Sequence, residues 1–349
     1  MYPQQIIDAL NQVRYPGTGK TIIESGMLED DIRIEGLKVS FSLIFHKQND
    51  PFEKSLVKAA EAAIKTYVDK NCTVVINTKH PAAVVAKDDA EQGINHFGKI
   101  IAVASGKGGV GKSTVTANLA IALTQRGKKV GLLDADIHGP SQPMMFNVEQ
   151  ARPVASNING KDYIEPIEQY GVKLLSIGFF VDSDSAIVWR GGMASNALRQ
   201  LIEEAHWGNL DYFLIDLPPG TSDIHLTLIQ TLNLDGAIIV TTPQAVALTD
   251  AVKGIDMFQN DKINVPILGI VENMAWFTPK ELPQNKYYVF GKEGGKQLAE
   301  RLGITLLGQV PLVQSIRESG DEGMPVAMQE GHPAAQLFRE IAQKIIEKN

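Results

Sequence analysis

The stretch that decides the fold is Ser105-Gly106-Lys107-Gly108-Gly109-Val110-Gly111-Lys112-Ser113-Thr114. From Gly106 to Ser113 it has the G-x-x-x-x-G-K-[ST] spacing of a phosphate-binding loop. The apolar run 101–104 precedes the stretch and predicts a buried strand, and apolar residues at helical spacing follow it as far as Gly127. A glycine-rich turn that binds nothing is the alternative, but such a turn does not need a strand before it and a helix after it. The context therefore predicts a nucleotide site.

The residue types in this loop have a chemical reason. Glycines allow backbone N–H groups to turn inward around phosphate oxygens, where the N-terminus of the following helix adds a favourable dipole. We expect Lys112 to lie against the β- and γ-phosphates and the Ser113 hydroxyl to ligate Mg²⁺. The predicted nucleotide contacts in the loop are Gly106, Lys107, Gly108, Gly109, Val110, Gly111, Lys112, Ser113 and Thr114.

The composition of the 349-residue chain limits the class of protein. Its length is sufficient for two domains, and a formal net charge of −7 argues against a nucleic-acid-binding surface as the main function. No apolar run reaches the roughly 18 residues needed to span a bilayer, and the first residues lack the basic-then-apolar build of a signal peptide. The single cysteine, Cys72, excludes an internal disulfide framework and suits a reducing compartment. We therefore expect a cytoplasmic protein whose partners are neither nucleic acid nor membrane.

Two domains are predicted, joined by a short linker. Residues 1–90 combine helical patterns with an alternating strand, which indicates a small α+β domain. Residues 91–98 are the expected linker, and residues 99–349 alternate apolar strands with helical stretches. Strands alternating with crossover helices predict an α/β domain with a mainly parallel, doubly wound sheet. Ligands of such sheets bind at the carboxyl ends of the strands, where the phosphate loop begins.

Two further predicted strands end in carboxylates. Asp134 and Asp136 follow an apolar strand, and Asp216 ends the apolar run 212–215. Alone, an aspartate at a strand end is more often a satisfied cap than a ligand, but two such ends downstream of an intact phosphate loop favour a metal site. One carboxylate of the first pair is expected to act through the Mg²⁺ shell and the other to orient the attacking water, while Asp216 contacts Mg²⁺-bound water.

Lys107 is not required by the minimal motif. A lysine at the start of the loop has the option of pointing into a facing subunit, so that two loops meeting across a twofold axis exchange lysines. Each lysine would then supply the cation that an arginine finger supplies elsewhere. The alternative is a solvated surface lysine, and the spacing alone does not decide between the two.

Together the motifs resemble one family of nucleotide-binding proteins. Lys107–Thr114 is similar to the deviant phosphate loop of nitrogenase iron protein, septum-site MinD and plasmid-partition ParA ATPases. Residues 134–141, Asp-Ala-Asp-Ile-His-Gly-Pro-Ser, and residues 216–223, Asp-Leu-Pro-Pro-Gly-Thr-Ser-Asp, narrow the resemblance to the Mrp/ApbC branch, over roughly residues 99–349. Residues 1–90 resemble, more weakly, the small iron–sulfur-assembly domain often fused ahead of this ATPase. Further stretches that look like the branch are Trp189-Arg190-Gly191, Thr242-Pro243-Gln244 and Val271-Glu272-Asn273-Met274.

The resemblance implies a homodimeric cytoplasmic ATPase that uses ATP and Mg²⁺ and carries iron–sulfur clusters to apoproteins or works with assembly factors. It implies that Lys107 acts in trans, that Lys112, Ser113 and Thr114 contact phosphate and metal, and that Asp136 orients water. Asp216 is placed on the Mg²⁺ side, and the predicted Mg²⁺ site consists of Ser113, Asp134 and Asp216. Asn273 and the loop around Pro311 are implied in adenine contact. No role is assigned to Arg190, for which a structural ion pair is an equal alternative.

The sequence departs from the family where cluster ligands belong. Members that bridge a cluster between subunits carry C-x-x-C shortly after the Glu-Asn-Met stretch, whereas residues 275–285 contain no cysteine. Clusters are held chiefly by thiolates, commonly four, and a dimer of this chain supplies two, both Cys72. We interpret Cys72 as a core residue rather than a ligand, and the seven histidines are scattered. The iron–sulfur ligands therefore stay unassigned.

Two functional hypotheses follow. The first is an ATPase of iron–sulfur cluster assembly, which either holds a cluster through unusual ligands or assists transfer without holding one. The second is a MinD- or ParA-like positioning ATPase that acts on a membrane or DNA, for which residues 338–349 offer an amphipathic helix. Such an apolar stripe is more often core packing, and the amino-terminal domain has no place in the second hypothesis. We therefore favour the first.

Overall fold

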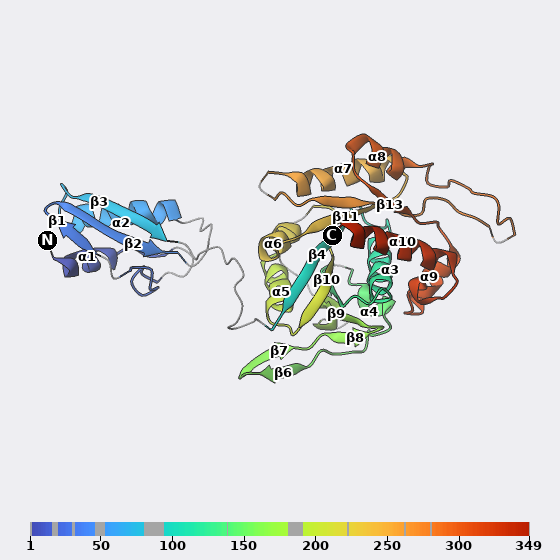
Figure 1. Cartoon of the computed structure of the whole chain (residues 1–349), viewed down its shortest axis with the longest axis horizontal. Coiled ribbons are helices and arrows are strands. Elements are labelled where there is room, and N and C mark those ends of the chain that lie inside the picture. Colours follow the sequence, from blue (N-terminus) through green and yellow to red (C-terminus); the bar gives the residue numbers. More distant parts are fainter. Residues whose placement is uncertain are drawn as a thin grey trace. The chain divides into compact units, whose positions relative to one another are not determined.

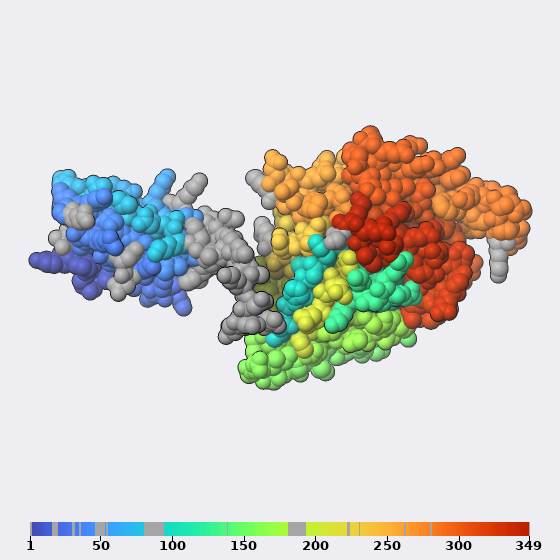
Figure 2. All heavy atoms as spheres, in the orientation of Figure 1, coloured from blue at the N-terminus to red at the C-terminus, as the bar shows by residue number. Residues whose placement is uncertain are grey.

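The computed structural model describes residues 2–15, 20–29, 32–45, 53–79, 94–137, 139–180, 191–221, 223–261, 263–279 and 281–348; the others are grey in Figures 1 and 2. The chain forms two compact units, Met1–Glu91 and Gln92–Asn349. Each unit has its own hydrophobic core.

The first unit is a small α+β fold around a three-stranded sheet. β1 (Arg33–Glu35) pairs antiparallel with β2 (Lys38–Ile44), and β2 pairs parallel with β3 (Thr73–Lys79). A parallel pair needs a crossover, which α2 (Glu53–Tyr67) supplies, and α1 (Pro3–Leu10) packs against α2. Cys72 lies in this core, where burial raises the pKa of its thiol.

The second unit is built on an eight-stranded sheet in the order β13-β12-β11-β4-β10-β5-β9-β8. Its neighbouring strands are parallel except β8 and β9. The mainly parallel, doubly wound sheet predicted from the sequence is therefore confirmed. The strands are β4 (His96–Ala104), β5 (Val130–Asp134), β8 (Ile167–Gln169), β9 (Val172–Ser176), β10 (Asn209–Asp216), β11 (Gly236–Thr241), β12 (Ile267–Glu272) and β13 (Leu306–Gln309).

Helices cover both faces of this sheet (Figure 1). α3 (Lys112–Thr124) leads the chain from β4 toward β5, whereas four later helices lead it in the opposite direction along the sheet. Because crossovers between parallel strands are right-handed, this change of direction places α3 on the opposite face from those four. The direction reverses at β4, so the loop after β4 lies at the switch point where such sheets bind ligands. The four helices are α5 (Gly191–Glu203), α6 (Asp223–Thr231), α7 (Ala245–Gln259) and α8 (Gly294–Leu302).

The remaining elements lie at the ends and edges of the unit. α10 (Pro333–Lys348) packs beside α3 (Figure 2), and α4 (Gln142–Met145) contacts α9 (Gln314–Asp321). A separate hairpin joins β6 (Ala155–Ile158) to β7 (Lys161–Ile164). No helix in the described part of the chain combines the length and the apolar character needed to cross a bilayer.

One expected boundary needs correction, and one interpretation is confirmed. β4 begins at His96, so the segment 91–98 that the sequence predicts to be a linker already contains the start of the central strand. The apolar face of α10 is not a surface feature, because Phe338, Ile341 and Ile345 are at most 1% exposed and belong to the core. The amphipathic pattern used for the membrane hypothesis is therefore core packing.

Candidate functional site

The phosphate loop joins β4 to α3, and two of its glycines are required by their surroundings. A Cβ at Gly106 would lie 2.1 Å from the carbonyl carbon of Asp250 in α7. Gly111 has a left-handed φ of +83°, and a Cβ there would lie 2.2 Å from Nδ2 of Asn273. The loop is therefore packed against α7 on one side and against the segment after β12 on the other.

Lys112 is the charged centre of the site. Its Nζ lies 2.6 Å from Asp216 Oδ1, 3.2 Å from Ser113 Oγ and 4.0 Å from Asp136 Oδ2. The side chain is only 6% exposed, so a carboxylate holds the ammonium group away from bulk water. In this low-dielectric setting the ammonium group would also attract phosphate oxygens strongly.

Asp216 is fully buried at the end of β10 and is held by several donors. Besides Lys112, its oxygens accept hydrogen bonds from Thr116 Oγ1 at 3.1 Å and from Gln142 Nε2 at 2.8 Å. Gln142 Nε2 also donates to the Ser113 carbonyl oxygen at 3.1 Å. Gln142 therefore connects the phosphate loop to the strand end.

Asp134 lies next to Asp216, because β5 and β10 are neighbours and these two residues are in register. Its fully buried carboxylate accepts hydrogen bonds from the backbone N–H groups of Asp136 and Gln142, at 3.2 and 3.1 Å, and from Ser176 Oγ at 3.0 Å. Burial, together with the charge of Asp216, raises the pKa of Asp134 to about 7. Its place on the Mg²⁺ side stays a prediction.

Asp136 and Lys107 are closer to solvent. The Asp136 side chain is 13% exposed and lines the same cavity as Ser113. Lys107 is exposed at the start of the loop and does not line this cavity. The geometry is compatible with the role in trans, which stays a prediction.

Two adjoining cavities surround the loop. A cavity of about 240 Å³ is lined by Ser105 and residues 108–114 together with Asp136 and Pro219. A second cavity of about 350 Å³ extends from it past Asn273 and Pro311 to α9. The two share four residues, Gly111, Thr114, Ser141 and Met145, so one elongated ligand can occupy both. Of the predicted nucleotide contacts, residues 108–114 line the first cavity and Asn273 and Pro311 line the second, whereas Gly106 and Lys107 line neither.

The residues at this junction fit a nucleotide. The Ser141 hydroxyl oxygen is buried there and has no hydrogen-bond partner among the described residues. Buried polar atoms in proteins are normally satisfied, so an unpartnered one beside a cavity favours a polar ligand. Asn273 Nδ2 donates to the Val110 carbonyl oxygen at 2.8 Å, which holds the wall of the second cavity against the loop. The Asn273 amide is therefore a support of the loop as well as a predicted base contact.

Three contributors were not predicted from the sequence, namely Gln142, Thr116 and the Ser141 hydroxyl. Gln142 is fully buried between Ser141 and Pro143. The sequence signal that could have indicated Gln142 is a long polar side chain placed between the turn-forming residues Ser141 and Pro143. Trp189 and Arg190, which matched a family motif, lie outside the described residues.

The structure brings no cluster ligands together in the part of the chain it describes. There, no group of three or more His, Cys, Asp or Glu side chains is arranged to hold a metal ion. Cys72 is buried in the first unit. The segment after Met274, where the resemblance places C-x-x-C, forms an orange lobe that projects from the second unit (Figure 2).

A parallel sheet with a glycine-rich loop and a buried lysine at its switch point defines the class of P-loop nucleotide-binding proteins. Residues 96–346 match the family described as NUBPL iron-transfer P-loop NTPase, and residues 3–76 match a family described as iron-sulfur cluster assembly protein. The chain belongs to this iron-transfer P-loop NTPase family. The resemblance identified from the motifs is thereby confirmed.

Relatives that match over most of the chain have names that refer to iron–sulfur proteins. An iron-sulfur cluster carrier protein of Synechocystis is 41% identical over 346 residues, which cover 98% of this chain and 96% of the relative. An iron-sulfur cluster carrier protein of Escherichia coli is 45% identical over 269 residues, 76% of this chain and 71% of the relative. A mitochondrial iron-sulfur protein of Arabidopsis, described as required for NADH dehydrogenase, is 46% identical over 71% of this chain and 77% of its own length.

Solved structures agree with the fold of the second unit. A nucleotide-binding protein of Archaeoglobus fulgidus in complex with ADP is 37% identical, with a TM-score of 0.58, over 68% of this chain and 90% of that chain. The cell-division ATPase MinD of Pyrococcus furiosus is 25% identical, with a TM-score of 0.53, over 72% of this chain and 100% of that chain.

Proposed function

We propose that this chain binds ATP with Mg²⁺ as a homodimer and hydrolyses it in the service of iron–sulfur cluster assembly, with apo iron–sulfur proteins or assembly factors as partners in the cytoplasm. The observation that carries the proposal is the elongated double cavity, in which the buried Lys112 and the unpartnered Ser141 hydroxyl face a site long enough for phosphates and a base. The names of the relatives indicate the process that the ATPase serves.

The charges of the site support a divalent cation. The carboxylates of Asp136 and Asp216 lie within 4.0 Å of the Lys112 ammonium group, and Asp134 is the neighbour of Asp216 in the sheet. A nucleotide triphosphate adds negative charge to this excess, so a hard cation such as Mg²⁺ is needed to balance it. The Ser113 hydroxyl is the protein oxygen best placed as a ligand, while Asp134 and Asp216 are fully buried and would act through metal-bound water.

The chain's own residues divide the work of hydrolysis. Lys112 exchanges part of its contact with Asp216 for phosphate oxygens, and Asp136 accepts a proton from, or orients, the water that attacks. Lys107 of a second copy supplies the additional cation, because it is exposed at the mouth of the loop rather than folded into its own site. Such a cation stabilises the charge that develops on the transferred phosphoryl group.

The cluster is cargo, and this chain does not supply the thiolates to hold it. One cysteine per chain gives two per dimer, and Cys72 is 4% exposed. A cluster commonly requires four thiolates. We therefore propose that the ATPase assists cluster transfer without a four-thiolate site of its own.

The experiment measures the recovery of activity by an apo [4Fe–4S] dehydratase supplied anaerobically with iron, sulfide and thiol. Addition of this chain with ATP and Mg²⁺ should accelerate recovery several-fold, and Lys112→Met should remove the acceleration. Iron and sulfide analysis of the reisolated chain should find less than about one cluster per ten dimers. Equal recovery with and without the chain at every concentration would contradict the proposed process.

A further inference from the structure

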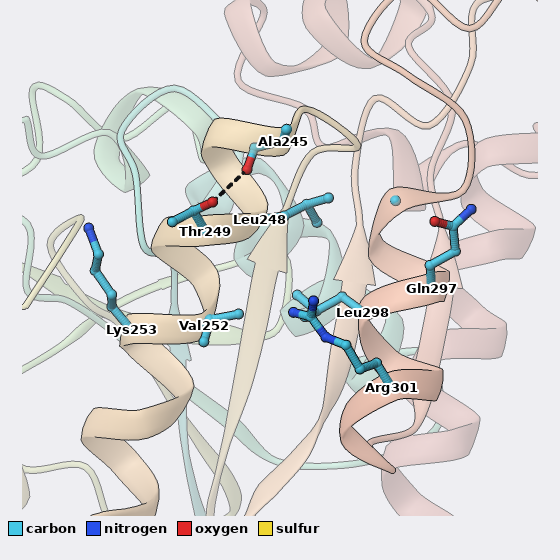
Figure 3. Close-up of a pocket in the computed structure, with 9 residues that line it drawn as sticks. Ala245, Leu248, Thr249, Val252, Lys253, Gln297, Leu298 and Arg301 are labelled. Carbon is cyan, nitrogen blue, oxygen red and sulfur yellow. Dashed lines mark hydrogen bonds between the residues drawn. The ribbon is translucent and has the colours of Figure 1, made fainter.

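A groove lies between α7 and α8, away from the nucleotide cavities (Figure 3). Its volume is about 620 Å³, and its walls are residues 245–253 of α7 and 294–301 of α8. At about 1.5 Å per residue, each wall is roughly two helical turns long. These are the dimensions at which a helix of a partner presents apolar side chains at positions i, i+3 or i+4, and i+7.

The chemistry of the groove is apolar with one cation. Leu248 and Val252 point from α7 toward α8, and Leu298 and Arg301 point back from α8 (Figure 3). No hydrogen bond or ion pair within the described residues engages the Arg301 guanidinium. The other cation of the lining, Lys253, points to the outer side of α7, where it pairs with Asp250 at 3.0 Å.

Charge complementarity selects the occupant. No carboxylate lines the groove, and Arg301 is its one cation without a partner among the described residues. One free guanidinium among aliphatic side chains suits a single carboxylate flanked by apolar residues, whereas a nucleic acid needs many cations.

Both walls of the groove are connected to the nucleotide site, α7 directly and α8 through Glu272. The backbone of α7 meets the phosphate loop so closely that a Cβ on Gly106 would lie 2.1 Å from Asp250 and 2.5 Å from Ala251. The N-terminus of α8 is fastened to Glu272, whose Oε1 accepts a hydrogen bond from the Gly295 N–H at 3.2 Å. Glu272 directly precedes Asn273, which holds the loop at Val110. A change in the spacing of α7 and α8 is therefore felt at both ends of the phosphate loop.

We infer that the α7–α8 groove docks an acidic amphipathic helix of a partner protein, and that docking is coupled to nucleotide binding. The coupling rests on the proposed nucleotide site, whereas docking itself is measurable without nucleotide. Linkage makes the coupling reciprocal: a nucleotide that changes the affinity for the helix is itself bound more or less tightly by the same factor.

The probe is a set of fluorescent 14-residue helical peptides with leucine, isoleucine, phenylalanine or methionine at the i, i+3, i+4 and i+7 positions, one glutamate beside this apolar stripe, and alanine or glutamine elsewhere. A matched set carries lysine in place of glutamate. Binding to the full chain is measured by anisotropy, and the site is located by methyl NMR of Leu248, Val252 and Leu298. We expect at least one acidic peptide to bind with a dissociation constant below about 100 μM and to shift these methyl signals.

Charge exchange separates this groove from other surfaces. Arg301→Glu should weaken the best acidic peptide at least tenfold and give measurable binding to its lysine counterpart, while Arg199→Glu, at an exposed arginine on α5, should leave the dissociation constant unchanged. Addition of the non-hydrolysable analogue AMPPNP with Mg²⁺ should change the dissociation constant of the peptide at least threefold.

Three results would overturn the inference. One is that no acidic peptide shifts the groove methyl signals. Another is that laurate at 1 mM shifts them while peptides do not, which would assign the groove to a small amphiphile. The third is an unchanged peptide affinity under saturating AMPPNP, which would remove the coupling. If AMPPNP itself does not bind, the proposed nucleotide site fails independently of the docking result.

Discussion

The carboxyl end of the sheet and the segment that follows Met274 are opposite in character. At the sheet end, Lys112, Gln142 and Asp216 are buried and bound to one another through defined hydrogen bonds. The segment 275–289 instead exposes large apolar side chains and contains no thiol. Phe277, Leu282, Tyr287, Tyr288 and Val289 are between 37% and 63% exposed.

The two regions differ in the chemistry that their residues suit: the sheet end suits a nucleotide, whereas segment 275–289 lacks the thiols of a cluster site. A buried polar network is costly where a member lacks a partner, and Gln142 Oε1 has none among the described residues. An unsatisfied atom of this kind beside the phosphate loop favours a polar ligand. The segment is ordered by other means: Phe277 and Tyr287 form an antiparallel bridge, and Lys286 Nζ lies 3.9 Å from the centre of the Trp276 ring. Large exposed apolar side chains are typical of contact surfaces, and the segment has no thiol to ligate a cluster.

The largest expected effect is at the sheet end. Lys112→Met should lower ATP hydrolysis by at least about 100-fold, because the positive charge that faces the phosphates is lost. It should also destabilise the second unit by about 3–5 kcal/mol, because Asp216 is left buried without its cation. Turnover and urea unfolding test the two effects, with Lys129→Ala, an exposed lysine, as the control. Turnover within twofold of wild type would show that Lys112 is not in the active site.

A second test introduces thiols into segment 275–289. The Leu282 N–H donates to the Pro279 carbonyl oxygen at 3.1 Å, so residues 279 and 282 stand at the two ends of one tight turn. Pro279→Cys with Leu282→Cys creates C-x-x-C there, and a dimer then offers four such thiolates. Anaerobic reconstitution should raise bound iron from near zero to about four atoms per dimer, also in a Cys72→Ser background.

The wild-type chain treated in the same way is the control. Stoichiometric iron and sulfide on wild type would mean that ligands other than thiolates hold a cluster, and the contrast between the two regions would disappear. Bound iron in neither protein would mean that the two segments 275–289 do not meet in the dimer.

Sequence patterns predicted the sheet and one end of the site for a clear reason. Buried parallel strands are nearly continuous apolar runs, and the residues that end them, such as Asp134 and Asp216, must share one edge. β4 was predicted too short because His96-Phe97-Gly98-Lys99 mixes polar and apolar residues. Gly98 is needed there, since a Cβ would lie 2.7 Å from the Asp211 carbonyl oxygen, and a close approach of this kind leaves no periodic signal.

The rest of the site depends on how loops fold back. Gln142 reaches Ser113 and Asp216 only because the loop after β5 turns onto the start of α3. Neither hydrophobic period nor a short motif encodes that return. The same holds for the groove between α7 and α8, whose walls come from segments about 50 residues apart and whose cation, Arg301, is unremarkable in the sequence.

Lys107 should have a smaller effect than Lys112, and a different one. Lys107→Ala should reduce turnover about 10- to 100-fold while nucleotide affinity stays within about threefold, because the exposed side chain acts on the partner's phosphates. The decisive measurement mixes Lys107→Ala with Lys112→Met. A heterodimer then contains one intact composite site, and an equimolar mixture should recover about a quarter of wild-type turnover. A lysine that acts in its own site gives no recovery, and a merely solvated lysine gives no loss.

The smallest effect concerns the carboxylate beneath the site. Because the pKa of Asp134 is raised from its ordinary value of 3.8 to about 7, the folded state binds more protons than the unfolded state between these values. The unfolding free energy attributable to this group therefore falls as the pH rises from about 4 to about 7, and is level above that. Asp134→Asn has no such proton, so its melting temperature should gain several degrees on wild type between pH 5 and pH 8 in the presence of a chelator. The control is Asp211→Asn, at a solvent-exposed carboxylate that accepts a hydrogen bond from the Lys129 backbone N–H. Its melting temperature should change with pH as that of wild type does. If the melting temperatures of Asp134→Asn and wild type changed equally with pH, Asp134 would already be ionised at neutral pH. Lys112 would then offset the charge of both buried carboxylates rather than that of Asp216 alone.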